Sequence, residues 1–375
     1  MAHAYTPGLQ VMERTLFRAV RTLPIAGEVQ RKLGERVTSQ DVVAETLLPG
    51  DVFPVNLANQ LGLVPAEVPR SLLKTIGDTV MVGELLAVSP GMFGFFRAEY
   101  HSKHTGTIES VSNITGQMIL RGPQIPVRVL AYTNGTVVEV LPREGVIVES
   151  EAALIQGIFG IGGEAYGTVC VVSARADQDL TPELLNESHR GKIVVAGRRI
   201  PGSAIRRAAE LGVSAIVAGG IDDQDLRDIL GYDLGVAITG TEQIGVTVII
   251  TEGFGEIAMA DRTFAILKSH HGASAAVNGA TQIRAGVIRP EIVIPLPDRS
   301  HTDKVAATVG GGVLDIGSPV RIIRDPYFGV LGTVSHLPPE PQLLETGSKA
   351  RVLEVNCADG RRLTVPRANV EIVST

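Results

Sequence analysis

Short polar and glycine-rich segments follow several predicted strands in the middle of the chain, and they hold the residue types best suited to bind a ligand. Glycine lets a ligand approach the backbone, a threonine hydroxyl both donates and accepts hydrogen bonds, and carboxylates bind sugars or metal ions. The alternative is that these residues only end strands and cap the helices that follow. The candidates are Gly219, Gly220, Asp222, Thr239, Gly240, Thr251, Glu252 and Gly253.

A second polar island, residues 278–289, contains Arg284 and Arg289 between apolar segments. Two guanidinium groups are suited to clamp an anion. A structural ion pair with Glu252 or Glu256 across a domain boundary is the alternative. With the first group of candidates, these arginines predict a site for a small anionic ligand in this part of the chain.

The motifs that mark common enzymes are missing from the sequence. It contains no Gly-x-Ser-x-Gly elbow, no Walker lysine motif and no zinc-protease pair. The spacing of His101 and His104 suits metal binding from a turn, but only Glu99 lies nearby as a further ligand, so we interpret both as surface histidines. We therefore expect no metal and no cofactor, and favour a non-enzymatic protein over an enzyme.

A glycine-rich run at residues 157–167 contains Gly160-x-Gly162, yet Ala165 occupies the position of the third glycine in a dinucleotide-binding fingerprint. A hinge or a close-packed turn is the favoured interpretation, and phosphate binding is the alternative.

These candidates must be positioned by alternating strands and helices. Apolar runs predict strands at 192–196, 214–218, 235–238, 246–250 and 273–277, with helices at 203–211, 222–230 and 256–270. This alternation predicts a parallel-sheet α/β domain, which we assign to residues 168–296. The segments at 191–195 and 208–220 loosely resemble swivelling or DRTGG-like regulatory domains.

An internal repeat is the strongest pattern of the N-terminal part. Gly34-Glu35-Arg36-Val37, followed by Val42-Val43-Ala44, recurs 43 residues later as Gly77-Asp78-Thr79-Val80, followed by Leu85-Leu86-Ala87. A second echo relates Gly106-Thr107-Ile108 to Gly135-Thr136-Val137. Each Gly-acid pair predicts a turn, and each apolar run predicts a strand leading away from it.

This order of motifs resembles the barrel-sandwich hybrid fold of lipoyl and biotinyl carrier domains, and especially the version in the C subunit of Rnf-type electron-transport complexes and in the large RNA polymerase subunits. The resemblance covers about residues 23–145, and we assign residues 23–167 to this β domain. In carrier domains the attachment lysine lies on the hairpin after the Leu-Leu-Ala strand. Here residues 45–49 and 88–92 contain no lysine, and Lys103 lacks the flanking motif. The resemblance therefore implies the fold without the carrier function.

Before this domain, residues 1–22 are expected to contain an amphipathic helix. The spacing of Leu9, Met12, Leu16, Phe17 and Val20 is helical, with Arg14, Arg18 and Arg21 on the other side. Docking on the protein itself or on a twin subunit is favoured over binding a membrane surface.

After a linker at residues 297–311, residues 312–375 resemble a KOW-type SH3-like barrel, with the motifs at 317–323, 328–334, 349–355 and 370–373. Related barrels bind RNA, and the candidate RNA-binding residues are Arg321, Arg324, Arg361, Arg362 and Arg367. Seven basic residues are balanced by seven acids in this segment, so phosphate-driven affinity should be weak.

Composition limits the remaining classes. The chain of 375 residues has a net charge of −6, no tryptophan and 4% aromatic residues, which argues against a large nucleic-acid surface. Its 42 glycines and 21 prolines, placed between short Val/Ile-rich runs, indicate a largely β protein. The two cysteines suit buried hydrophobic positions, and the sequence shows no signal region or membrane-spanning stretch. We expect a cytoplasmic protein without membrane insertion.

The sequence therefore predicts a multidomain α+β protein with a barrel-sandwich hybrid, a parallel α/β domain and a C-terminal SH3-like barrel. The leading functional hypothesis is a scaffold or adaptor with protein partners or self-association, carrying a sensor domain for a small anionic ligand. The alternatives are an RNA-, ribosome- or RNA polymerase-associated factor, and an enzyme with its site at the strand ends of the α/β domain.

Overall fold

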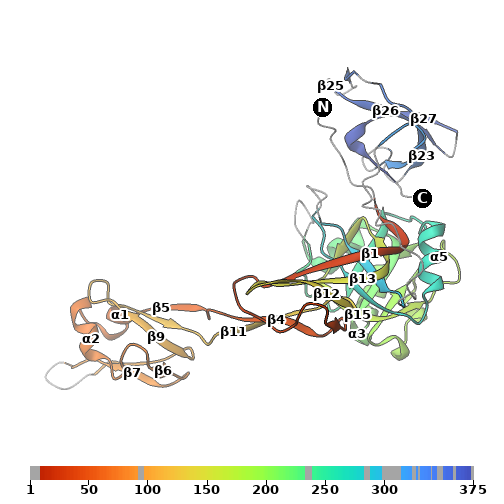
Figure 1. The fold of residues 1–375 in the computed structure, drawn as a ribbon. Helices are drawn as coiled ribbons and strands as arrows, with labels where there is room; N and C mark the ends of the chain where they lie inside the picture. Colours follow the sequence, from red (N-terminus) through yellow and green to blue (C-terminus); the bar gives the residue numbers. More distant parts are fainter. Residues whose placement is uncertain are drawn as a thin grey trace.

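The computed structural model describes residues 9–91, 97–232, 239–282, 288–297, 314–322, 327, 330–338, 340–343, 349–357 and 360–372. It shows a multidomain, mixed α+β protein built mostly of strands. A β-rich head lies at the end of two long strands, away from the body of the molecule, and a separate C-terminal sheet, in blue, lies above the body in this view (Figure 1). Among the described residues, no helix combines the length and apolar character needed to cross a membrane.

One sheet of 12 strands forms the body and joins the N-terminal strands to the middle of the chain. Its N-terminal members are β1 (Val11–Thr22), β3 (Arg36–Val37), β12 (Gly135–Leu141) and β13 (Gly145–Gln156). The others are β14 (Phe159–Ile161), β15 (Glu164–Val171), β16 (Lys192–Val195), β17 (Arg199–Ile200), β18 (Ala215–Ile221), β19 (Thr247–Phe254), β20 (Ser274–Asn278) and β21 (Glu291–Pro295). The boundary expected after residue 167 falls inside β15, and β13 pairs directly with β21.

The middle of this sheet, with its helices, is the α/β unit. Strands β15, β16, β18 and β19 are parallel neighbours, whereas β14 pairs antiparallel with β19, β20 with β15, and β21 with β20. The residues of β18 and β19 are buried on both faces, which explains their continuous Val/Ile runs. Helices α3 (Gly202–Leu211) and α4 (Asp223–Leu230) contribute to the core on one face, and α5 (Asp261–Ser269) to the core on the other.

Most α/β elements agree with the predicted ones, with two differences. The predicted helix at 256–270 begins only at Asp261, because the preceding residues form a loop over the ends of neighbouring strands. The last predicted strand, β20, is antiparallel, so the sheet is only partly parallel. The predicted strand at 235–238 lies outside the described residues.

The predicted N-terminal helix is wrong, because residues 11–22 form strand β1. This strand pairs with β13 along its whole length, from Val11 opposite Ile155 to Thr22 opposite Gly145. Leu16 and Val20, placed on the apolar face of the helix, are 42% and 59% exposed. Long-range pairing with β13 has overridden the local helical spacing.

The repeat found in the sequence forms two β units of the same design. The base unit contains β1, β3, β4 (Val42–Leu48), β11 (Ile125–Leu130), β12 and β13. The head unit contains β5 (Val52–Asn56), β6 (Thr79–Val80), β7 (Leu85–Val88), β8 (Glu99–His101), β9 (Gly106–Val111) and β10 (Gln117–Arg121), with short helices α1 (Leu57–Leu61) and α2 (Val68–Ser71). In the base, β3 pairs with β12 and β4 with β11; in the head, β6 pairs with β9 and β7 with β8.

Equivalent hydrogen bonds and strand irregularities show how closely the two units agree. The amide of Gly34 donates to Val137 O at 2.8 Å, and that of Gly77 donates to Ile108 O at 2.8 Å. Both glycines have positive φ. The bulge in β12 after Val137 corresponds to the bulge in β9 after Ile108. In each unit, the segment that begins at Gly34 or Gly77 therefore pairs with the segment that begins at Gly135 or Gly106, respectively.

Acidic side chains hold the turns on both sides of these short strands. Asp41 accepts the amide of Thr38 at 2.8 Å, and Glu84 in the head accepts the amide of Met81 at 2.9 Å. Hydrogen bonding to the charged form lowers the pKa of Asp41, chiefly through Thr38, and that of Glu84, through Lys74 first and Met81 second. Glu35 and Asp78, the acids of the predicted Gly-acid pairs, accept the amides of Lys32 and Thr75 at 2.9 and 2.8 Å, so these turns form as predicted.

The two units are nested rather than adjacent. Strands β4 and β11 of the base continue beyond their shared bulge and pair as far as Leu48 and Ile125. All of the head lies between these two strands in the chain. Strands β4 and β11 of the base correspond to β7 and β8 of the head, which are joined by a direct connection. At the same position in the base the whole head is inserted, and β4 and β11 form the stalk that carries it (Figure 1).

The described part of the chain after residue 313, which we call the C-terminal unit, contains a five-stranded antiparallel sheet. Its strands are β22 (Pro319–Ile322), β23 (Leu331–His336), β26 (Val352–Cys357), β27 (Arg362–Pro366) and β28 (Val370–Ile372), beside the small pair β24 (Gln342–Leu343) and β25 (Lys349–Ala350). Val320, Val334, Leu353 and Val355 lie in its core.

Candidate functional site

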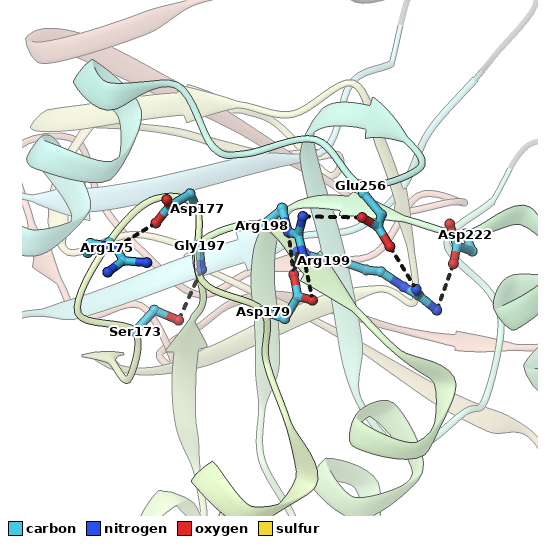
Figure 2. A network of polar contacts seen from close by, with 9 residues as sticks. All are labelled: Ser173, Arg175, Asp177, Asp179, Gly197, Arg198, Arg199, Asp222 and Glu256. Carbon is cyan, nitrogen blue, oxygen red and sulfur yellow. Dashed lines mark hydrogen bonds and ion pairs between the residues drawn. The ribbon is translucent and has the colours of Figure 1, made fainter.

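The carboxyl ends of the parallel strands in the α/β unit are the place where such a sheet commonly binds ligands. Ser173 follows β15, Gly197 follows β16, Asp222 follows β18 and Glu256 follows β19. We refer to this region as the carboxyl edge. Figure 2 shows charged side chains from several of these loops gathered along it.

The space beside the glycines of the carboxyl edge is filled by other parts of the protein. A Cβ atom on Gly219 would lie 2.2 Å from Ile257 O, and one on Gly220 would lie 2.1 Å from Gly255 O. A Cβ on Gly197 would lie 2.3 Å from Arg175 O. The loops after β15 and β19 therefore pack against the glycine backbone, so the approach that we predicted for a ligand is taken by the chain's own loops.

Two arginines and four acids form an ion-pair network at the edge. Arg198 binds both oxygens of Asp179, with distances of 2.7 and 2.9 Å. Arg199 pairs with Asp222 at 2.6 Å and with Asp225 at 2.9 Å. Glu256 lies between the two arginines, at 3.2 Å from Arg198 and 3.4 Å from Arg199 (Figure 2).

This network lowers the pKa of Asp179, mainly through its hydrogen bonds from Arg198. The acids outnumber the arginines, so an anion at this edge would meet net repulsion. Of the network, we had singled out Asp222 alone as a ligand candidate. The adjacent pair Arg198-Arg199 after a strand was the signal available in the sequence.

Glu252 and Arg321, predicted for different roles, lie against each other. The carboxylate of Glu252 accepts a hydrogen bond from Arg321 Nη2 at 2.5 Å, and Thr251 O accepts one from Nη1 at 3.3 Å. Each of the two charged side chains is 7% exposed. Glu252 therefore already has a partner within the protein, and Arg321 is buried, where it cannot contact RNA.

The other arginine candidates are spread over the C-terminal unit and the α/β unit. Arg361 and Arg362 are exposed, and Arg367 is partly buried, where it donates to the carbonyls of Val352 and Pro338. Arg284 and Arg324 lie outside the described residues. Arg289 is half-buried beside β21, whereas Glu252 and Glu256 pair with other arginines.

Thr239 and Gly240 belong to a largely buried hydrogen-bond network with the glycine-rich run at residues 157–167. The hydroxyl of Thr281 accepts the amide of Gly160 at 2.9 Å, and that of Thr239 donates to Gly160 O at 2.8 Å. Glu242 accepts the amides of Gly162 and Gly240 at 3.0 and 2.7 Å. The glycine amides that would bind a phosphate therefore donate to side chains of the protein.

Thr281→Val is expected to lower the free energy of unfolding by about 1–2 kcal/mol, because it leaves the buried amide of Gly160 without an acceptor. Urea unfolding followed by circular dichroism measures the loss. Thr79→Val, at an exposed threonine of β6, is the matched control and should have almost no effect. Equal effects of the two substitutions would show that the hydrogen bond between Gly160 and Thr281 does not stabilise the fold.

The two predicted surface histidines have separate partners. His101 Nδ1 lies 3.0 Å from Gly83 O, whereas the ring of His104 stacks on Phe53 with 3.9 Å between centroids. Within the described part of the chain, no three His, Cys, Asp or Glu side chains gather as metal ligands.

A cluster of ionisable side chains that the sequence analysis missed lies between the base and α/β units. Arg21 binds both oxygens of Glu164, at 2.6 and 2.8 Å, and its guanidinium lies 5.3 Å from the ring centre of Tyr132. Tyr166 donates to Glu164 at 3.1 Å. Arg21, Glu164 and Tyr166 line a cavity of about 470 Å³.

Burial dominates the electrostatics of this cluster. It raises the pKa of Glu291 to about 7, with a further increase from the charge of Glu164, against the opposing effects of Tyr132 and Arg21. Burial also raises the pKa of the Tyr132 hydroxyl far above its usual value. Tyr132 has a positive φ of 72°, which is strained for a bulky residue. The residues come from β1, β15, β21 and a turn, so no local motif identifies them.

The described residues thus show a carboxyl edge that is closed by the chain's own loops and ion pairs, and a partly buried ionisable cluster beside a cavity. Comparison with known proteins adds no further assignment, since neither a protein-family model nor a curated protein sequence matches this chain.

Proposed function

We propose that the protein is a non-enzymatic scaffold that presents its head unit to a protein partner. In this proposal the base and head are barrel-sandwich-type units and the C-terminal unit is an SH3-like barrel. The base unit holds a complete second unit at the position where a carrier domain has its lysine hairpin. In this proposal the head, inserted between β4 and β11, takes the place that the cofactor has in a carrier domain.

The proposal rests on a difference between the head and the base in the side chains exposed on equivalent turns. Leu73, Met81 and Val82 are 59%, 66% and 65% exposed on the turns that flank β6. Lys74 of the first turn pairs with Glu84 of the second at 2.5 Å, so the two turns lie together. The equivalent positions in the base are polar: Gln30, Thr38 and Ser39.

Because the same turns form with polar residues in the base, folding does not require apolar ones in the head. Exposed apolar side chains that cluster on one surface are typical of interaction sites. The nearly balanced charge of the head, with acids and bases interspersed along it, suits an apolar partner surface better than a polyanion.

The test transfers the base residues into the head as Leu73→Gln, Met81→Thr and Val82→Ser. We expect this variant to retain its unfolding free energy within about 1 kcal/mol, because surface substitutions have small effects. It should lose most of its association with cellular proteins. Site-specific photo-cross-linking from position 76, next to the changed turns, measures this loss in cells that express the full chain.

Leu33→Gln, at an exposed apolar position of the base, is the control and should leave the cross-links from position 76 unchanged. Adducts to a second copy of the chain would identify self-association as the function of the head. If the triple variant gave the same adducts as the original chain, the proposed docking surface would be wrong.

A further inference from the structure

Thr251 and Glu252 form a buried acceptor site at the carboxyl end of β19. One oxygen of Glu252 accepts the amide of Ala260 at 3.0 Å, immediately before α5, and the other accepts Nη2 of Arg321. The carbonyl of Thr251 accepts Nη1 of the same guanidinium at 3.3 Å. Glu252 is thus held between the amide of Ala260 and the guanidinium of Arg321, with one carboxylate oxygen and one carbonyl directed at the cation.

The geometry of the acceptors is specific for a guanidinium group. Two separate nitrogen atoms of one planar group meet two acceptors on consecutive residues, an arrangement that a single ammonium group does not reproduce. The nearby loops add Asp222 and Glu256, so the net charge of the edge also favours a cation.

Burial makes the occupation of this site obligatory while the C-terminal unit is docked. A carboxylate that is 7% exposed is strongly destabilised when its partner is removed, because its charge has then lost both water and counter-ion. The C-terminal unit supplies that partner from 69 residues further along the chain. Detachment of this unit would return water to Glu252 and leave one of its oxygens, with the carbonyl of Thr251, open to another donor.

We propose that Thr251 and Glu252 form a guanidinium-binding site. The C-terminal unit fills it with Arg321 when that unit is docked on the carboxyl edge, and an arginine side chain of a partner protein fills it when the unit is detached. The site lies in the α/β unit, so this inference is independent of the docking surface on the head.

Chemical rescue in the full-length protein tests the site. Arg321→Ala should increase hydrogen exchange of the Ala260 amide by about tenfold or more, because Glu252 is no longer fixed. Millimolar methylguanidinium should restore protection, and methylammonium at the same concentration should not. In the double variant Arg321→Ala with Glu252→Gln, methylguanidinium should have no effect. Equal responses of the single and double variants would overturn the proposal.

Two further measurements separate folding and the source of the ligand. Arg321→Lys keeps the charge and the bulk of the side chain, so it tests the site if the alanine variant fails to fold; it should lose protection at Ala260, because one ammonium group does not meet both acceptors. N-acetyl-arginine amide should bind the alanine variant at least tenfold more tightly than the original chain. Equal binding to both proteins would show that Arg321 does not occupy the site.

Discussion

Gly219→Ala is expected to lower the free energy of unfolding by roughly 3 kcal/mol or more, at the upper end of the effects of overpacking. The added Cβ would lie 2.2 Å from Ile257 O and 2.6 Å from Met259 N. Both contacts are with backbone, so no side-chain rotation relieves them, and the loop between β19 and α5 must move. That loop also fixes the amide of Ala260 against Glu252.

Gly163→Ala provides the matched control, because the nearest atom to its added Cβ is Gly240 O at 3.2 Å. We expect it to change the unfolding free energy by less than about 1 kcal/mol. Urea unfolding followed by far-UV circular dichroism compares the two variants. If Gly219→Ala were as stable as the control, the loop would be free to leave the strand ends, and the ligand approach predicted from the sequence would regain support.

This comparison shows why the carboxyl edge was only partly predictable. Val/Ile runs predicted the strands β16, β18 and β19, although β18 and β19 continue to Ile221 and Phe254, beyond the predicted ends at 218 and 250. Glycine at a strand end is equally suited to a ligand and to another part of the backbone, and local sequence does not distinguish the two. Here residues 255–259 fill the space, and the same loop shortens the helix predicted at 256–270.

In the N-terminal part, too, local sequence predicted turns but not the long-range pairing of strands. The repeat predicted the turns at Gly34 and Gly77 correctly, since both depend on positive φ and an acid next in the chain. That the head is inserted within the base depends on pairing between β4 and β11, whose partners lie about 80 residues apart. Strand β1 likewise pairs with β13 across more than 100 residues, so its local helical spacing was misleading.

Candidate residues were found more reliably than their partners. Glu252 and Arg321 were both identified, the first for a ligand and the second for RNA, and the structure pairs them with each other. The cluster around Glu291 was missed altogether. Glu291 ends a polar segment next to an apolar strand, and its burial follows only from the packing of the base unit on the α/β sheet.

Glu291→Gln is expected to stabilise the protein by roughly 3 kcal/mol at pH 8 and to have little effect at pH 4.5. The pKa of this carboxyl is raised from 4.5 to about 7 in the folded protein, chiefly by burial. Below pH 4.5 it is protonated in both folded and unfolded chains. Between pH 4.5 and 7 only the unfolded chain ionises, so the original protein loses stability as the pH rises, at about 1.4 kcal/mol per unit.

Glutamine keeps the shape of the protonated carboxyl without its ionisation, so the variant should lose this part of the pH dependence. Urea unfolding at several pH values from 4.5 to 8 measures the difference between the two proteins. Glu149→Gln, which removes the partner of Arg18 in a more exposed ion pair, should change stability by less than about 1 kcal/mol at any of these pH values. Parallel pH profiles of the Glu291 variant and the original chain would mean that Glu291 ionises normally.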